Sequence, residues 1–89
     1  MSATERMRQT VRAAEIKWGT ELQKKMVIGE CAELITSMVD YDRGRDGLHD
    51  LCDEVADVFI MLDFMRLYLG DENVDAAIER KLERLEERL

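Results

Sequence analysis

Two short motifs place pairs of carboxylates inside otherwise apolar stretches of the sequence. The acids are Glu30 and Glu33 in "GECAEL", and Glu54 and Asp57 in "DEVADV". Within each pair the two acids are three positions apart, which brings them to one face of an α-helix, about 60° apart around its axis. Each motif therefore predicts a narrow acidic strip on a helix that is otherwise apolar.

Carboxylates that converge in a partly buried cleft repel one another and lose hydration, at a cost of about several kcal/mol per unpaired ion. Mg²⁺ relieves this repulsion because it binds carboxylate oxygens and keeps some of its waters, and Mn²⁺ can substitute for it. The ordinary alternative is a set of exposed salt bridges, but no lysine or arginine stands four residues after Glu30, Glu33 or Glu54. Two matching pairs on consecutive apolar segments therefore predict one metal site shared by all four acids.

Apolar residues recur with helical periodicity along the whole chain. They predict one helix up to Trp18, a second over about 20–39, a third over about 48–69 and a fourth that begins near Asp71 or Asn73. Glycines stand at the predicted interruptions, and Asp46 in the loop "DYDRGRDG" is a predicted cap for the third helix.

These elements predict an all-α protein with a single domain over residues 1–89. The expected architecture is a four-helix bundle in which the two long central helices are antiparallel, so that both acidic strips face one cleft. The central helices are apolar almost all round, and one small chain cannot cover both completely. We therefore expect an oligomer, either a homodimer or a dimer of dimers.

Charge and composition restrict the range of partners. The net charge is −7 and the sequence pI is about 4.7, which argues against binding nucleic acid through a basic surface. No apolar run is long enough to cross a bilayer and no signal peptide is recognisable, so no membrane partner is expected. Cys31 and Cys52 are too few for a disulfide framework. A cytoplasmic protein with reduced cysteines is expected.

The acidic motifs and their surroundings resemble those of the MazG-like nucleotide pyrophosphohydrolases, especially the short single-domain members common in phages and bacteria. The resemblance covers nearly the whole chain and includes "KWGTELQ", "GECAEL", "YDRG", "DEVADVFIML" and "KLERLEERL". It implies that Glu30, Glu33, Glu54 and Asp57 bind Mg²⁺. It also implies hydrolysis of a nucleoside triphosphate between the α and β phosphates, which gives a monophosphate and pyrophosphate.

One position departs from the pattern of that family. Many members have two adjacent acids at the start of the first motif, whereas this chain has Gly29 in place of the first acid. The change removes a group that could hold a second metal or activate water there. Among the acids that are left, Glu33 is the first candidate to accept a proton from the attacking water, and Glu30 is the second.

Binding of a phosphate tail also requires positive groups. The candidates are Lys81 at the edge of the apolar stripe of the last helix, Arg43 and Arg45 in the loop, and Lys17 beside Trp18. Each of these cations has an equally good interpretation as an ordinary solvated side chain. Trp18 is a candidate to stack on a base, although a lone tryptophan at helical spacing is more often part of a core.

Two other functions fit the same residues. The chain can be a non-catalytic helical interaction module that uses the leucine stripe of its last helix as a contact surface. It can also be an enzyme that resembles phosphoribosyl-ATP pyrophosphatase and acts on a different nucleotide. Stabilisation by Mg²⁺ separates the first alternative from an enzyme, and pyrophosphate release from a panel of nucleotides addresses the second.

Overall fold

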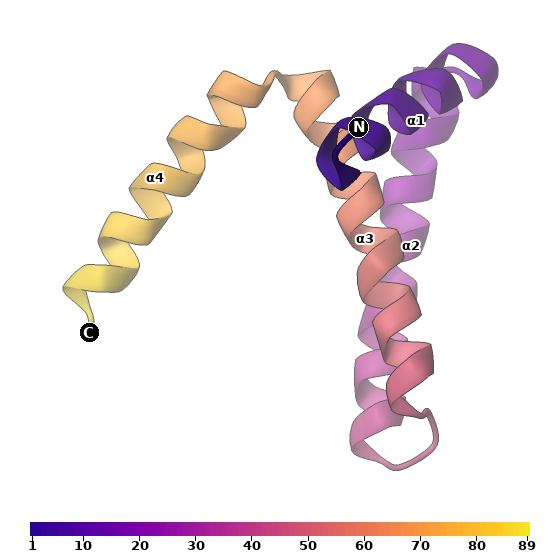
Figure 1. The fold of residues 1–89 in the computed structure, drawn as a ribbon. Helices are drawn as coiled ribbons and strands as arrows, with labels where there is room; N and C mark the ends of the chain where they lie inside the picture. The colour runs from indigo at the N-terminus through magenta and orange to yellow at the C-terminus, as the bar shows by residue number, and fades with distance from the viewer.

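The computed structural model describes residues 1–89 and is entirely helical (Figure 1). Its elements are α1 (Ala3–Trp18), α2 (Thr20–Asp42), α3 (Leu48–Leu69) and α4 (Asp71–Glu87). The predicted all-α class is confirmed. None of the four helices combines the length and the apolar character needed to cross a bilayer.

Local chemistry explains where the helices begin and end. Ser2 caps α1 by accepting the amide of Glu5 at 3.1 Å. Gly19 and Gly70 separate α1 from α2 and α3 from α4, with φ values of 88° and 98° that other residues rarely adopt. The second helix continues to Asp42, three residues beyond the predicted end at position 39, so the turn before α3 is shorter than expected.

The start of α3 differs from the prediction. Asp46 does not cap this helix, because its Oδ2 atom accepts a hydrogen bond from Ser37 Oγ at 3.0 Å. Instead, Asp50 in the first turn of α3 accepts the amide of Gly47 at 3.1 Å. The hydrogen bond between Ser37 and Asp46 connects the turn to α2.

The two long helices α2 and α3 lie side by side and antiparallel, and α1 packs against both of them (Figure 1). The buried apolar residues come from α1 and α3: Val11, Val58, Met61 and Phe64. Phe64 is completely buried. The α2–α3 pair is the frame that carries both acidic motifs.

The fourth helix leaves this frame. Its backbone approaches only α3, and Figure 1 shows it directed away from the other three helices after the turn at Gly70. Within one chain only α1, α2 and α3 pack together as a bundle. The predicted four-helix bundle is therefore not formed by one chain alone. The apolar stripe of α4 stays open to solvent, with Ile78, Leu82 and Leu85 each about half exposed.

Candidate metal site

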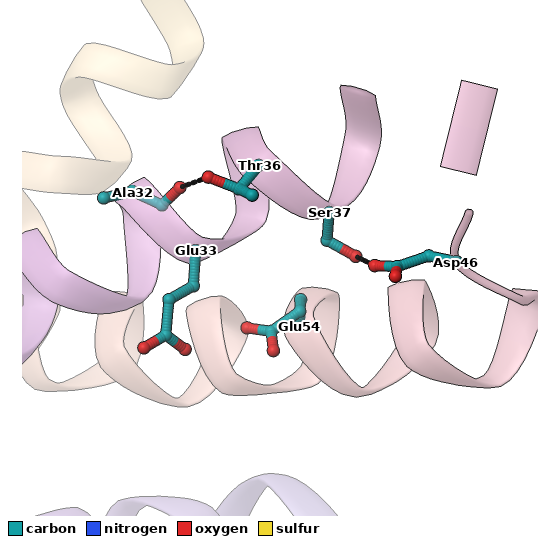
Figure 2. A pocket seen from close by; sticks show the side chains of 6 residues that line it. All are labelled: Ala32, Glu33, Thr36, Ser37, Asp46 and Glu54. Carbon is teal, nitrogen blue, oxygen red and sulfur yellow. Dashed lines mark hydrogen bonds between the residues drawn. The ribbon is translucent and has the colours of Figure 1, made fainter. Parts of the chain in front are cut away.

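Three of the four predicted acids meet between α2 and α3. Glu30, Glu33 and Glu54 each offer one carboxylate oxygen, and these oxygens all lie within 4.8 Å of one another. The first two acids project from α2 and the third from α3. Figure 2 shows the side chains of Glu33 and Glu54 in the space between the two helices. We call these three residues the acidic cluster.

Two carboxylate oxygens of the acidic cluster have no partner. Glu30 and Glu54 are half-buried, and the Oε2 atom of each is buried without any hydrogen bond. A buried carboxylate oxygen without a donor is unfavourable, and most buried polar atoms in proteins are satisfied. Both orphaned oxygens belong to the acidic cluster. A cation bound between the helices would give both of them a partner.

The electrostatics of the acidic cluster raise two pKa values. Burial raises the pKa of Glu30, and the negative charges of Asp57, Glu33 and Glu54 raise it further. The pKa of Glu54 is also raised, first by burial and then by Glu33 and Asp57. The charged forms of both groups are therefore disfavoured in the metal-free fold.

Asp57 lies at the edge of the acidic cluster. It is exposed and does not share the close oxygen contacts of the other three acids. It does line a small cavity of about 110 Å³ together with Glu30, and its charge contributes to the raised pKa of that residue. Of the four predicted ligands, the structure thus brings three together and leaves the fourth beside one of them.

A cavity of about 320 Å³ adjoins the acidic cluster on the side of the turn (Figure 2). Glu33 and Glu54 form one end of its lining, and Ser37 and Asp46 form the other. Ala32 also lines it, and its methyl group leaves room that a larger side chain would fill. Most of the residues that line the cavity are polar, and it is large enough to admit a small charged group beside the acids.

The candidate phosphate-binding residues do not line this cavity. Lys17 and Trp18 are at the end of α1, before the start of α2 at Thr20, which is about 15 Å from Glu30 along α2 at a rise of about 1.5 Å per residue. Arg43 follows the last residue of α2, about 15 Å from Glu33 on the same scale. Lys81 belongs to α4, which extends away from α2 (Figure 1).

The structure gives two of these candidates other contacts. The Nζ atom of Lys17 lies 5.1 Å from the centroid of the Trp18 ring, a cation–π distance. Trp18 is 54% exposed, so it does not belong to the core. Arg45, the other loop candidate, lies 3.9 Å from a carboxylate oxygen of Asp40. Besides burial, the main groups that raise the pKa values of Glu30 and Glu54 are neighbouring carboxylates.

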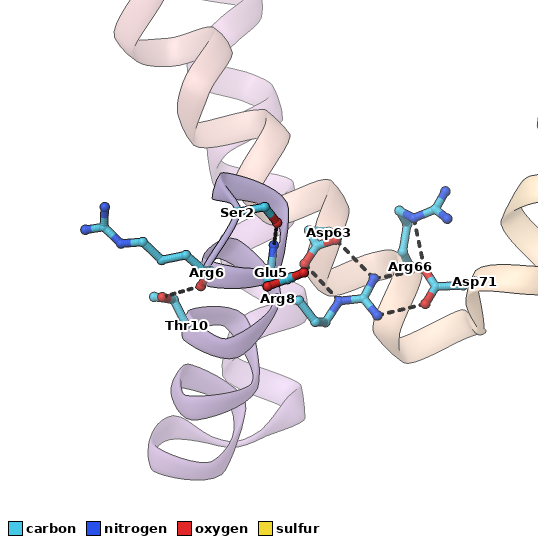
Figure 3. Close-up of polar contacts among 8 residues, drawn as sticks. All are labelled: Ser2, Glu5, Arg6, Arg8, Thr10, Asp63, Arg66 and Asp71. Carbon is cyan, nitrogen blue, oxygen red and sulfur yellow. Dashed lines mark hydrogen bonds and ion pairs between the residues drawn. The ribbon is translucent and has the colours of Figure 1, made fainter.

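A second group of charges was not predicted from the sequence. Arg8 of α1 donates two hydrogen bonds of 3.0 Å to Asp63 of α3 and two of 2.7 and 2.8 Å to Asp71 of α4 (Figure 3). Arg66 bonds to Asp71 at 3.0 Å and to Asp75 at 2.8 Å. We call these five residues the arginine cluster. It joins three helices at the point where α4 begins.

The one sequence signal for the arginine cluster is Asp63. It stands alone between Leu62 and Phe64 in the most apolar helix, and its side chain is buried. A buried aspartate requires a partner, but Arg8 is 55 positions away and cannot be identified as that partner from local spacing. Hydrogen bonding to Arg8 lowers the pKa of Asp71 to about 2.

The acidic cluster is a set of oxygen donors of the kind that Mg²⁺ and Mn²⁺ accept. The chain matches no known protein family, no curated protein and no solved structure. The kind of ion that the site can bind is therefore judged from its residues alone. Three carboxylates on α2 and α3, two of which have an orphaned oxygen, fit a divalent cation.

Proposed function

We propose that this protein is a Mg²⁺-dependent nucleotide pyrophosphohydrolase that converts a nucleoside triphosphate, or a related nucleotide, into a monophosphate and pyrophosphate. The observation that carries the proposal is the pair of orphaned Oε2 atoms of Glu30 and Glu54, which lie with Glu33 in one cluster. The resemblance of both acidic motifs to those of the MazG-like enzymes supports the same reaction.

In this proposal Glu30, Glu33 and Glu54 hold the cation, with Asp57 at the edge of the site. When bound, Mg²⁺ would neutralise charge on phosphate oxygens and make water more acidic. Glu30 and Glu54 are the half-buried members, and α2 and α3 fix their positions. Their role is to hold charge in place before the substrate arrives.

Glu33 has a different environment from the other two acids. It is the exposed member of the acidic cluster and it lines the adjacent cavity. It is therefore the carboxylate best placed to accept a proton from a water that attacks phosphorus, and Glu30 is the second candidate. Ser37 lines the same cavity and donates a hydrogen bond to Asp46 at 3.0 Å.

The position of the broken bond follows from what the chain lacks. Its sequence has no glycine-rich loop of the kind that wraps a terminal phosphate, so the phosphate chain must be held chiefly at the acidic cluster. A leaving group with several oxygens, such as pyrophosphate, suits that arrangement. Water should then enter at the α phosphorus, beside the nucleoside.

The experiment is hydrolysis of a panel of nucleotides in ¹⁸O-labelled water with Mg²⁺ present. Pyrophosphate should be released from at least one nucleotide, and the label should appear in the nucleoside monophosphate. Label found only in orthophosphate would contradict the proposal, as would the absence of pyrophosphate release from the entire panel. A chelator control should abolish the reaction.

A non-catalytic interaction module is the second candidate, and the exposed apolar stripe of α4 favours it. That stripe is a contact surface whether or not the acidic cluster is an active site. The two candidates differ in their response to metal. An enzyme of the proposed type should bind Mg²⁺ in the folded state and become more stable, whereas a module whose acids have no ligand should not.

A further inference from the structure

The cavity of about 320 Å³ beside the acidic cluster is lined by side chains that accept hydrogen bonds. None of its six lining residues has a nitrogen atom in its side chain. Three of them are the carboxylates of Glu33, Asp46 and Glu54, and an ionised carboxylate accepts hydrogen bonds but donates none. Any free donor in this lining would therefore have to be a hydroxyl or a backbone amide.

The two hydroxyl groups in the lining already donate their hydrogens within the chain. Thr36 Oγ1 donates to the carbonyl oxygen of Ala32 at 3.3 Å, and Ser37 Oγ donates to Asp46 at 3.0 Å (Figure 2). The backbone amide of Asp46 donates to the carbonyl oxygen of Asp40 at 3.3 Å. Because a hydroxyl has only one hydrogen, these bonds leave acceptors facing a ligand. A group that binds here must bring positive charge or hydrogen-bond donors of its own.

The two ends of the cavity differ in how their carboxylates are held. Glu33 and Glu54 belong to the acidic cluster, where a cation would neutralise them. At the other end, Ser37 is only 5% exposed, and its Oγ atom engages one of the two carboxylate oxygens of Asp46. The second oxygen is left to accept from a ligand. Ser37 stands one helical turn after Glu33, about 6 Å further along α2.

We propose that Asp46 accepts a hydrogen bond from a sugar hydroxyl of the nucleotide, and that Ser37 holds Asp46 in position for this contact. The inference rests on the proposed function, since it takes the phosphates to lie at the acidic cluster. In a nucleotide the sugar is attached directly to the α phosphate, so it is the first neutral group beyond the metal. A hydrogen bond from a hydroxyl to a carboxylate is of the strong, charge-assisted kind.

Charge and size favour a sugar at this end of the cavity over the other parts of a nucleotide. A phosphate without a cation would be repelled by Asp46 and by the two acids opposite it. The second cavity beside the acidic cluster, which Glu30 and Asp57 line, is only about 110 Å³, and three of its five lining residues are apolar. The larger cavity, where only one of six lining residues is apolar, is the one that suits a group with hydroxyls.

The test compares nucleotides that differ by a single hydroxyl. For the unmodified protein, kcat/KM for pyrophosphate release should fall by about 10-fold when the contacting hydroxyl, at the 2′ or the 3′ position, is replaced by hydrogen. In Asp46→Ala this discrimination should disappear, because the acceptor is gone. A change in fold or in metal binding lowers activity on both nucleotides alike, so the ratio of the two kcat/KM values reports the contact itself.

The matched control is Asp42→Ala. Asp42 is the last residue of α2, is exposed and does not line the cavity, so its removal takes the same charge from the same turn. The discrimination should be unchanged in this variant. Ser37→Ala should reduce the discrimination without removing it, since Asp46 remains as an acceptor but loses the hydrogen bond that orients it.

The outcomes separate this inference from the proposed function. Full discrimination in Asp46→Ala, with pyrophosphate still released, would overturn the sugar contact and leave the reaction intact. An unmodified protein that treats both deoxy analogues like the parent nucleotide would also overturn the contact, as would one that discriminates only by the amino group of the base.

The same ratios are measurable without turnover, from the Kd values of non-hydrolysable α,β-imido nucleotides in a calorimeter with Mg²⁺ present. A protein that binds these analogues with the expected ratios, but releases no pyrophosphate from any nucleotide, would support the sugar contact and contradict the proposed reaction. A protein that neither binds nor hydrolyses any nucleotide would overturn both.

Discussion

The acidic cluster and the arginine cluster each contain three carboxylates, and the two clusters have opposite electrostatics. In the arginine cluster every acid has a guanidinium partner within 3.0 Å. In the acidic cluster two carboxylate oxygens are buried without a donor. The pKa of Asp71 is accordingly lowered, whereas the pKa values of Glu30 and Glu54 are raised.

The difference indicates what each group is for. A paired cluster is complete within one chain, and its role is to hold helices together. An unpaired cluster of like charges opposes folding until something positive enters it. The buried carboxylate of Asp63 is paired with an arginine. The buried oxygens of Glu30 and Glu54 have no such partner.

The largest expected effect is on activity. Glu54→Gln removes one charged ligand from the acidic cluster and should lower turnover by about 100-fold or more, because the charge that positions phosphate and water is lost. The matched control is Asp53→Asn, since Asp53 is the adjacent acid on α3, is exposed, and lies 3.4 Å from His49 rather than in the cluster. Steady-state pyrophosphate release measures both. An equal loss of turnover in the two variants would contradict a specific role for Glu54.

The next effect is on stability. Arg8→Ala leaves the buried carboxylate of Asp63 without its partner and should lower the free energy of unfolding by about 3 kcal/mol. Arg6→Ala, which removes an arginine of α1 that makes no ion pair, should change it by less than about 0.5 kcal/mol. Urea unfolding followed by circular dichroism gives both values. A similar midpoint for the two variants would show that the arginine cluster does not stabilise the fold.

The smallest effect is the pH dependence of the metal-free protein. The raised pKa values of Glu30 and Glu54 give stability that is present below the ordinary value of 4.5 and is lost as the pH rises through the raised values. The lowered pKa of Asp71 gives stability that is present above 3.8 and is lost as the pH falls towards about 2. Glu30→Gln should therefore reduce the fall in the free energy of unfolding above pH 4.5, but it should not change the fall at acid pH.

That measurement requires a chelator, because bound cation would compete with protons for the same oxygens. An unfolding free energy that rises steadily from pH 4.5 to pH 7 in the absence of metal would contradict the raised pKa values. The Arg8→Ala variant provides the opposite control, since it should reduce the loss of stability at acid pH without altering the slope above pH 4.5.

Much of the frame could be predicted because it depends on local pattern. Helical periodicity and glycines located α1, α3 and the breaks between helices within a few residues. The spacing of the acids predicted that Glu30, Glu33 and Glu54 would meet, because three residues on a helix amount to nearly one turn and two consecutive helices pack antiparallel. Ser37 stands seven residues after Glu30, on the same face of α2, and is buried there.

What could not be predicted depends on contacts between distant parts of the chain. The direction of α4 is set by Arg8, which is 63 positions from Asp71, and periodicity gives no information about such a pair. A leucine stripe has the same pattern whether it faces its own core or a groove. The exact place of Asp57 also depends on rotamers, since it lies on the predicted face of α3 but outside the oxygen contacts of the cluster.

Titration of the metal-free protein with Mg²⁺ in a calorimeter is the most direct test of the central claim, which is that the acidic cluster binds a divalent cation in the folded state. We expect saturable binding that is lost in Glu54→Gln and retained in Asp53→Asn. The same binding should stabilise the protein by about 2.7 kcal/mol at a concentration 100 times the Kd. Absence of binding, or equal binding by both variants, would contradict the account.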